Sequence, residues 1–255
     1  MLWNIPKELF IWDFVRQTES AIQKNASRRS FTKSYRMTMP TTAADPARAN
    51  APPRGAAVAG VIFSLLMGTT LIIARLSGPA YQTDPGYWLN DPTRRNALRF
   101  AIHLVPFAGI AFLWFMGVLR NRVGELEDRF FATVFFGSGM LFVASLFASA
   151  AFFGVLMEAM ASGRFQALNA DTFYLVRQLG GSFLNVFGIK MAGVFIISTS
   201  TIVLRTSILP RWVAYLGYAC ALVLLLVITN WPWIALLFPL WILVLSVGIL
   251  LTEFR

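Results

Sequence analysis

Four polar side chains stand out because they interrupt or end long apolar stretches. Lys190 lies about ten residues into one such stretch, Asn185 precedes it by five residues, and Glu158 ends another. His103 is the only histidine of the chain. A charge deep in a membrane costs about 2.5 to 3.5 kcal/mol on insertion scales, so an intramembrane lysine is a candidate for function. An ammonium, a carboxylate, an amide and an imidazole can together bind a polar ligand.

The spacing of these residues predicts a pocket near one membrane surface. A helical side chain leans toward the N-terminus of its own helix, so Lys190 reaches outward if the chain begins inside. Its ammonium then approaches Glu158 and His103, with Asn185 on the helix face above it. We therefore predict a hydrated pocket in the outer half of the bundle, lined by His103, Glu158, Asn185 and Lys190. The alternative is that Lys190 snorkels alone and His103 hydrogen-bonds to a neighbouring helix.

No sequence motif is specific for a reaction. The chain has no Walker A sequence, no H-E-x-x-H and no nucleophile elbow, and its single histidine excludes sites that need two. No Asp or Glu lies between the ends of the apolar runs, which argues against a proton-coupled pump. The single cysteine, Cys220, excludes a disulfide or Cys-based metal site within one chain. The sequence identifies no cofactor and favours a protein that is not an enzyme, although a lipid-modifying activity using His103 stays open.

The composition indicates that the surrounding solvent is lipid. Charged residues make up 13% of the chain, hydrophobic residues 57%, and the mean hydropathy is +0.63. A soluble domain has roughly a quarter charged and about half apolar residues. Beyond residue 56 the charges form short clusters between apolar runs, each near the roughly 20 residues needed to cross about 30 Å of hydrocarbon. We predict six membrane spans: Ala56–Leu76, Ala97–Leu119, Phe131–Met157, Gly180–Leu204, Trp212–Thr229 and Trp233–Leu251.

These spans predict an all-α fold, a polytopic transmembrane helix bundle over residues 56–255, with a partly disordered N-terminal extension. Residues 1–55 are basic and differ in kind from the rest. Within them, residues 8–24 have the spacing of an amphipathic helix, and the segment 38–54, rich in Ala, Pro and Thr, is expected to be a flexible linker. The alternative is that translation starts later, at Met37 or Met39, so that residues 1–36 are not part of the protein.

The basic residues define an orientation. Although the net charge is +10, thirteen of the 22 basic residues follow residue 56 and nearly all of these flank apolar runs, so we do not expect nucleic-acid binding. Lys and Arg are enriched in cytoplasmic loops, and one side holds eight arginines against six. The larger set predicts cytoplasmic N- and C-termini. The cytoplasmic side then holds Arg48, Arg54, Arg120, Arg122, Arg129, Arg205, Arg211 and Arg255. The outer side holds Arg75, Arg94, Arg95, Arg99, Arg164 and Arg177.

The stretch from Leu204 to Gly217 resembles the connection between the fourth and fifth spans in a family of uncharacterised bacterial six-span membrane proteins. The distinctive residues are Arg205 and the turn formed by Pro210, Arg211 and Trp212. The layout from residue 56 to the end is similar as well. The resemblance implies a fold and a bacterial origin, and it implies no activity because the family has no established one.

Three classes of function follow from these observations. The scarcity of polar residues favours a structural or accessory protein of the cytoplasmic (inner) membrane, whose partners are the lipid bilayer and other membrane subunits. A transporter, channel or ligand-binding membrane protein requires the polar pocket to exist. A membrane enzyme comes last, because the sequence contains no catalytic constellation.

Overall fold

The computed structural model is all-helical over the residues that it describes, which are 54–78, 91–123, 129–162, 170–206, 209–226 and 233–253. The chain divides into two units, residues 1–51 and residues 52–255, and the helices belong to the second. The predicted amphipathic helix at 8–24 lies outside the described residues. The same is true of the predicted linker, except that its last residue, Arg54, begins the first described helix.

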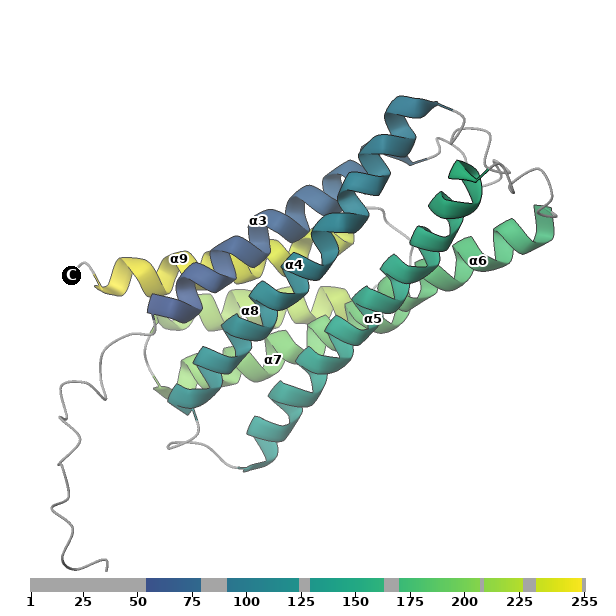
Figure 1. The fold of residues 1–255 in the computed structure, drawn as a ribbon. Helices are drawn as coiled ribbons and strands as arrows, with labels where there is room; N and C mark the ends of the chain where they lie inside the picture. The colour runs from purple at the N-terminus through teal and green to yellow at the C-terminus, as the bar shows by residue number, and fades with distance from the viewer. Residues whose placement is uncertain are drawn as a thin grey trace, which may run out of the picture. The chain divides into compact units, whose positions relative to one another are not determined.

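The described helices follow one another along the chain as antiparallel rods (Figure 1). Five helical stretches are long and apolar enough to cross a membrane, and the apolar helix α8 is shorter, with 16 residues. The segments α6, η3 and α7 follow one another without a break and form one long helix. The bounds are α3 Arg54–Ser77, α4 Pro92–Val123, α5 Arg129–Ala161, α6 Ala170–Ser182, the π-helical turn η3 Phe183–Gly188, α7 Ile189–Thr206, α8 Arg211–Leu226, the 3-10 turn η4 Ile234–Leu236 and α9 Leu237–Glu253.

The helix containing Lys190 begins ten residues earlier than the predicted Gly180, at Ala170. Its first part carries polar residues such as Asp171, and the sequence prediction began the span after them. The helix continues there because Phe173 is buried against Leu156 and Met157 of α5, in a small apolar cluster separate from the main core. An amphipathic helix forms when one of its faces is buried, whatever the polarity of the other face.

Neighbouring helices in the sequence also pack together. The most extensive contacts join α3 to α4 and α7 to α8, and α9 returns to pack against α3. The short connection after Thr206 makes α7 and α8 an antiparallel pair. Helix α8 is short and ends at Leu226. Its partner, the continuous helix formed by α6, η3 and α7, is longer and begins at Ala170.

Phenylalanines form the centre of the bundle. Seven buried rings come from α3, α4, α5, α7 and α9, and their centroids lie 4.7 to 6.5 Å apart in mostly tilted or edge-to-face pairs. Aromatic rings favour these arrangements because the positive edge of one meets the negative face of another. The cluster therefore holds five helices together through one continuous set of ring contacts: Phe63, Phe112, Phe115, Phe135, Phe142, Phe195 and Phe238.

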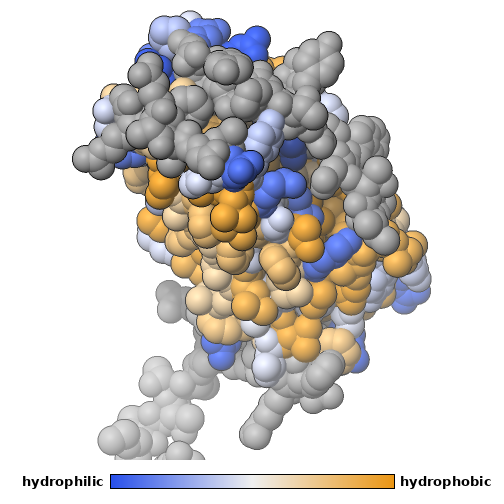
Figure 2. Space-filling view, turned by 90° about the vertical axis from the view of Figure 1, so that its right-hand side faces the viewer, coloured by the Kyte–Doolittle hydropathy of each residue, from blue (hydrophilic) through white to orange (hydrophobic). Residues whose placement is uncertain are grey.

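The outer surface of the bundle is apolar. Leu65, Trp114 and Leu222 are each more than half exposed, as are many other large apolar side chains. Figure 2 shows apolar side chains over the middle of the face that it displays. Soluble monomers seldom expose contiguous apolar surface of this extent. Such a surface is expected of helices whose solvent is lipid, because their outward-facing side chains contact hydrocarbon in place of water.

Close helix contacts occur where glycine removes a side chain. A Cβ atom added to Gly217 of α8 would overlap Ser200 Oγ of α7 and would lie 2.8 Å from Trp241 Nε1 of α9. A Cβ atom on Gly60 of α3 would likewise overlap Ser246 Oγ of α9. These two glycines therefore set how closely α7, α8 and α9, and α3 and α9, can approach.

Candidate functional site

Lys190 lies against the end of α8. Its ammonium Nζ donates hydrogen bonds to the backbone carbonyl oxygens of Leu224, at 3.0 Å, and Leu225, at 2.7 Å. Both carbonyls belong to the last turn of α8, where carbonyl groups have no partner within the helix. The C-terminal end of a helix also carries a partial negative charge, which attracts a cation. Lys190 therefore caps α8.

The lengths of the two helices explain this contact. Lys190 lies sixteen residues before Thr206, the end of α7, and α8 is itself 16 residues long. At 1.5 Å per residue each distance is about 24 Å, so an antiparallel pair brings the end of α8 back to the level of Lys190. Gly193 allows the close approach, since a Cβ atom there would lie 2.9 Å from Leu225 Cγ.

Asn185 lies in the π-helical turn that precedes Lys190. In this turn the N–H of Ile189 donates to the carbonyl oxygen of Leu184, five residues back. Such turns are rare and frequently occur at functional sites. The Asn185 side-chain oxygen accepts a hydrogen bond of 3.4 Å from Arg75 Nη2, which joins the last turn of α3 to the π-helical turn.

Arg75 was not among the residues predicted for the site. Sequence reasoning counted it only as one of the basic residues flanking a span. The signal that could have identified it is its position within α3: it follows an unbroken apolar run and precedes the end of the helix by two residues. Its side chain is partly buried, as expected when a long basic side chain covers apolar surface.

His103 and Glu158 lie on exposed surface elsewhere in the bundle. The side chain of Glu158 is 76% exposed, and its carboxylate lies 4.0 Å from Nη2 of Arg99. His103 is exposed on α4, four residues after Arg99 and so on the same face of that helix. Asn185 thus contacts Arg75, Glu158 contacts Arg99, and Lys190 contacts α8. A single pocket lined by all four predicted residues stays a prediction.

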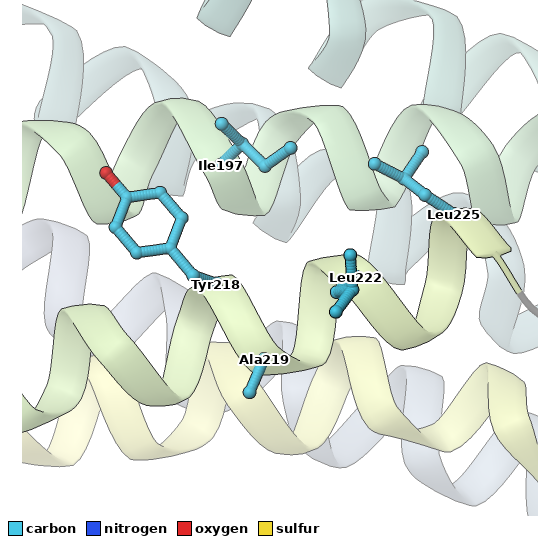
Figure 3. A pocket seen from close by; sticks show the side chains of 5 residues that line it. All are labelled: Ile197, Tyr218, Ala219, Leu222 and Leu225. Carbon is cyan, nitrogen blue, oxygen red and sulfur yellow. The ribbon is translucent and has the colours of Figure 1, made fainter.

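An apolar groove of about 370 Å³ follows the seam between α7 and α8. Ile197 of α7 and four residues of α8 line it: Tyr218, Ala219, Leu222 and Leu225 (Figure 3). The Tyr218 hydroxyl is directed toward α7 and lies 2.8 Å from Thr201 Oγ1. The groove could not be predicted, because its walls come from two helices whose rotation about their axes depends on packing.

Two arginines at the opposite end of the bundle stack on phenylalanine rings. The guanidinium carbon of Arg205 lies 4.5 Å from the centroid of Phe131, and that of Arg120 lies 5.1 Å from the centroid of Phe136. A cation over an aromatic face is attracted by the ring quadrupole. These contacts hold the basic ends of α4 and α7 against the first turns of α5. Among the residues that the structure describes, no group of three or more His, Cys, Asp or Glu side chains could hold a metal ion.

Comparison with known proteins adds no relative. No family model, curated protein or solved structure matches this chain. The resemblance of Leu204–Gly217 to a bacterial six-span family therefore stays a prediction.

Proposed function

We propose that this chain is a six-span protein of a bacterial cytoplasmic membrane that serves as a structural or accessory subunit. Its partners are lipid and other membrane subunits. The observation that carries the proposal is the phenylalanine cluster at the centre of the bundle. A conduit needs polar side chains or backbone carbonyls along its path. Here five helices are joined at the centre by rings, and Phe63, Phe112 and Phe195 are each 0% exposed.

The use of the polar side chains supports the same proposal. Lys190 caps α8, and Arg75 bonds Asn185 across two helices. Each contact fixes one helix relative to another. Polar groups that hold helices together are a known device in membrane bundles, where small and polar residues mark helix interfaces.

The proposed topology takes α8 as the fifth of six crossings, because residues adjoining its 16 positions can complete a span. An even number of crossings places both ends on one side, and the start of α3 and the end of α9 lie at the same end of the bundle (Figure 1). Arg120, Arg205 and Arg211 belong to that end too. We assign it to the cytoplasm because Lys and Arg are enriched there.

Reconstitution tests the absence of a conduit. Liposomes containing the full chain should release ions and small dyes no faster than empty liposomes. Cross-linking in native membranes should then join the chain to one partner in fixed ratio, and the same partner should be recovered when cross-linkers of different length are used. Flux well above that of empty liposomes, or a chain that stays monomeric under every cross-linker, would contradict the accessory role.

A second candidate function is ligand binding near the outer end of the bundle. The observation that favours it is the hydrogen bond between Arg75 and Asn185, with Lys190 five residues further along the same continuous helix. Two cations and an amide suit a small anionic ligand. The test is thermal unfolding of the detergent-solubilised protein with a panel of carboxylates and phosphates: stabilisation that is lost in Arg75→Gln would support this candidate, and no stabilisation by any of them would reject it.

A further inference from the structure

We propose that the outer part of the bundle tilts relative to the inner part about a joint. The joint crosses α3, α4 and the continuous helix formed by α6, η3 and α7. Outward here means toward the last turn of α3 and the first turn of α4. In a hinge motion a few residues absorb the change in backbone angles, and each of these helices has such residues at the joint. The tilt depends neither on the accessory role nor on the absence of a conduit.

Each of the three helices is weakened at one point. Pro106 lies inside α4, lacks a backbone N–H and leaves the carbonyl oxygen of Ile102 without its helical donor. The π-helical turn η3 interrupts the regular hydrogen bonding between α6 and α7. Gly68 lies inside α3, where glycine favours the helix less than alanine does, and a Cβ atom there would meet nothing within 4 Å. Prolines and π-helical turns are the usual causes of a sharp change in helix direction.

The three weak points lie at one level of the bundle. The ring centroids of Phe63 and Phe195 lie 4.9 and 5.1 Å from that of Phe112, so these residues mark one level in α3, α7 and α4. Outward from the rings, Gly68 follows after five residues, Pro106 after six and the π-helical turn after seven. At 1.5 Å per residue, all three lie about 8 to 11 Å beyond the rings. A common level allows the helices to bend together.

The described helices α8 and α9 end before this level. The ring of Phe238 in α9 lies 5.7 Å from that of Phe112, and η4, which leads into α9, begins only four residues earlier. A Cβ atom on Gly193 would lie 2.9 Å from Leu225 Cγ, so the last turn of α8 is level with a residue two positions outward of Phe195. At this end α4, α5 and α6 continue past α8 and α9 (Figure 1). The joint therefore lies where the bundle loses two of its helices.

The outer part is held together separately from the inner part. Phe173 of α6 and Leu156 of α5 belong to the small apolar cluster, and Leu98 of α4 packs against it. Arg99 of α4 and Glu158 of α5 add an ion pair at 4.0 Å. This cluster is distinct from the main core, so the two parts are expected to behave as two cooperative units. Helix α5 has no break at the joint and limits the motion to a small tilt.

The motion is measured by double electron–electron resonance on the full chain in lipid bilayers, with Cys220 replaced by alanine and spin labels on introduced cysteines. The crossing pair joins Leu175 of α6 to Leu222 of α8. The inner pair joins Val58 of α3 to Leu222, and the outer pair joins Phe100 of α4 to Leu175. All four label positions are exposed. We expect the distance distribution of the crossing pair to be about twofold wider than that of either other pair.

Two substitutions stiffen the joint, and each should narrow the crossing distribution. Pro106→Ala restores a backbone N–H in α4, and Gly68→Ala stiffens α3 without a steric clash. The double variant should bring the width close to that of the inner pair. Gly117→Ala is the matched control, because its Cβ atom also has no neighbour within 4 Å and it lies five residues inward of Phe112. The width should be unchanged in this variant.

A crossing distribution as narrow as that of the inner pair would overturn the proposal. So would a wide distribution that Pro106→Ala and Gly68→Ala both leave unchanged, or one that Gly117→Ala narrows as much. An outer pair as broad as the crossing pair would indicate fraying of separate helices in place of a tilt, and would overturn it as well. Liposome flux and cross-linking report on the accessory role independently, so the two failures can be told apart.

Discussion

Replacing Gly217 by alanine should destabilise the bundle, because α7, α8 and α9 meet at this residue. The new Cβ atom would overlap Ser200 Oγ and lie 2.8 Å from Trp241 Nε1. Ser200 is 0% exposed and Trp241 2% exposed, so neither can move out of the way into solvent. The helices have to separate, or the side chains have to leave their preferred rotamers.

The expected loss follows from two opposing effects. Overpacking of a filled core costs about 1 to 3 kcal/mol, and an overlap with two buried atoms belongs in the upper part of that range. Alanine also favours helix over glycine by up to about 1 kcal/mol. We therefore expect a net loss of about 1 to 2 kcal/mol in the free energy of unfolding. For a chain of this size that corresponds to a fall in Tm of about 2 to 8 °C.

The assay is thermal unfolding of the purified protein in detergent, followed by circular dichroism. Gly117→Ala is the matched control, because a Cβ atom on Gly117 has no neighbour within 4 Å, so its stability should hold or rise. Ser200→Ala removes one of the two overlapping atoms, a buried hydroxyl with no hydrogen-bond partner among the described residues. The double variant Ser200→Ala/Gly217→Ala should thus recover part of the loss. Wild-type stability of Gly217→Ala, or a loss that Ser200→Ala leaves unchanged, would refute the reasoning.

Three further predictions concern the cap, the topology and the N-terminal segment. Lys190→Leu should lower the free energy of unfolding more than Lys190→Arg, because leucine leaves two carbonyls of α8 without a donor and arginine can still cap them. The effect of Glu158→Gln on stability should be additive with that of Lys190→Leu. A Lys190→Leu protein as stable as the wild type, or strong coupling between the two variants, would contradict the cap. Reporter fusions at Asp84 and Asp171 should report an external location, and a cytoplasmic signal at either would reverse or break the proposed topology. A chain starting at Met37 should reach the membrane at near-normal levels, whereas its degradation or mislocalisation would make residues 1–36 a structural element.

The sequence by itself determined the helical character of the chain and most of the helix positions. In lipid each segment has to pair its backbone groups internally, so an apolar run of sufficient length becomes a helix whatever its neighbours are. The first predicted span, Ala56–Leu76, differs from α3 by two residues at its start and one at its end. The prediction was furthest from the structure at Ala170, where the helix is continued by burial of Phe173 and not by hydropathy.

Only the tertiary structure decided what the polar residues contact. The carbonyls capped by Lys190 lie 34 and 35 residues away in the sequence, and Arg75 and Asn185 are 110 residues apart. No local pattern encodes these separations, because they depend on the length of α8 and on how each helix is rotated about its axis. The groove between α7 and α8 and the phenylalanine cluster have the same origin. Hydropathy specifies that a segment crosses the membrane, and the packing of side chains from several helices then determines which residues meet.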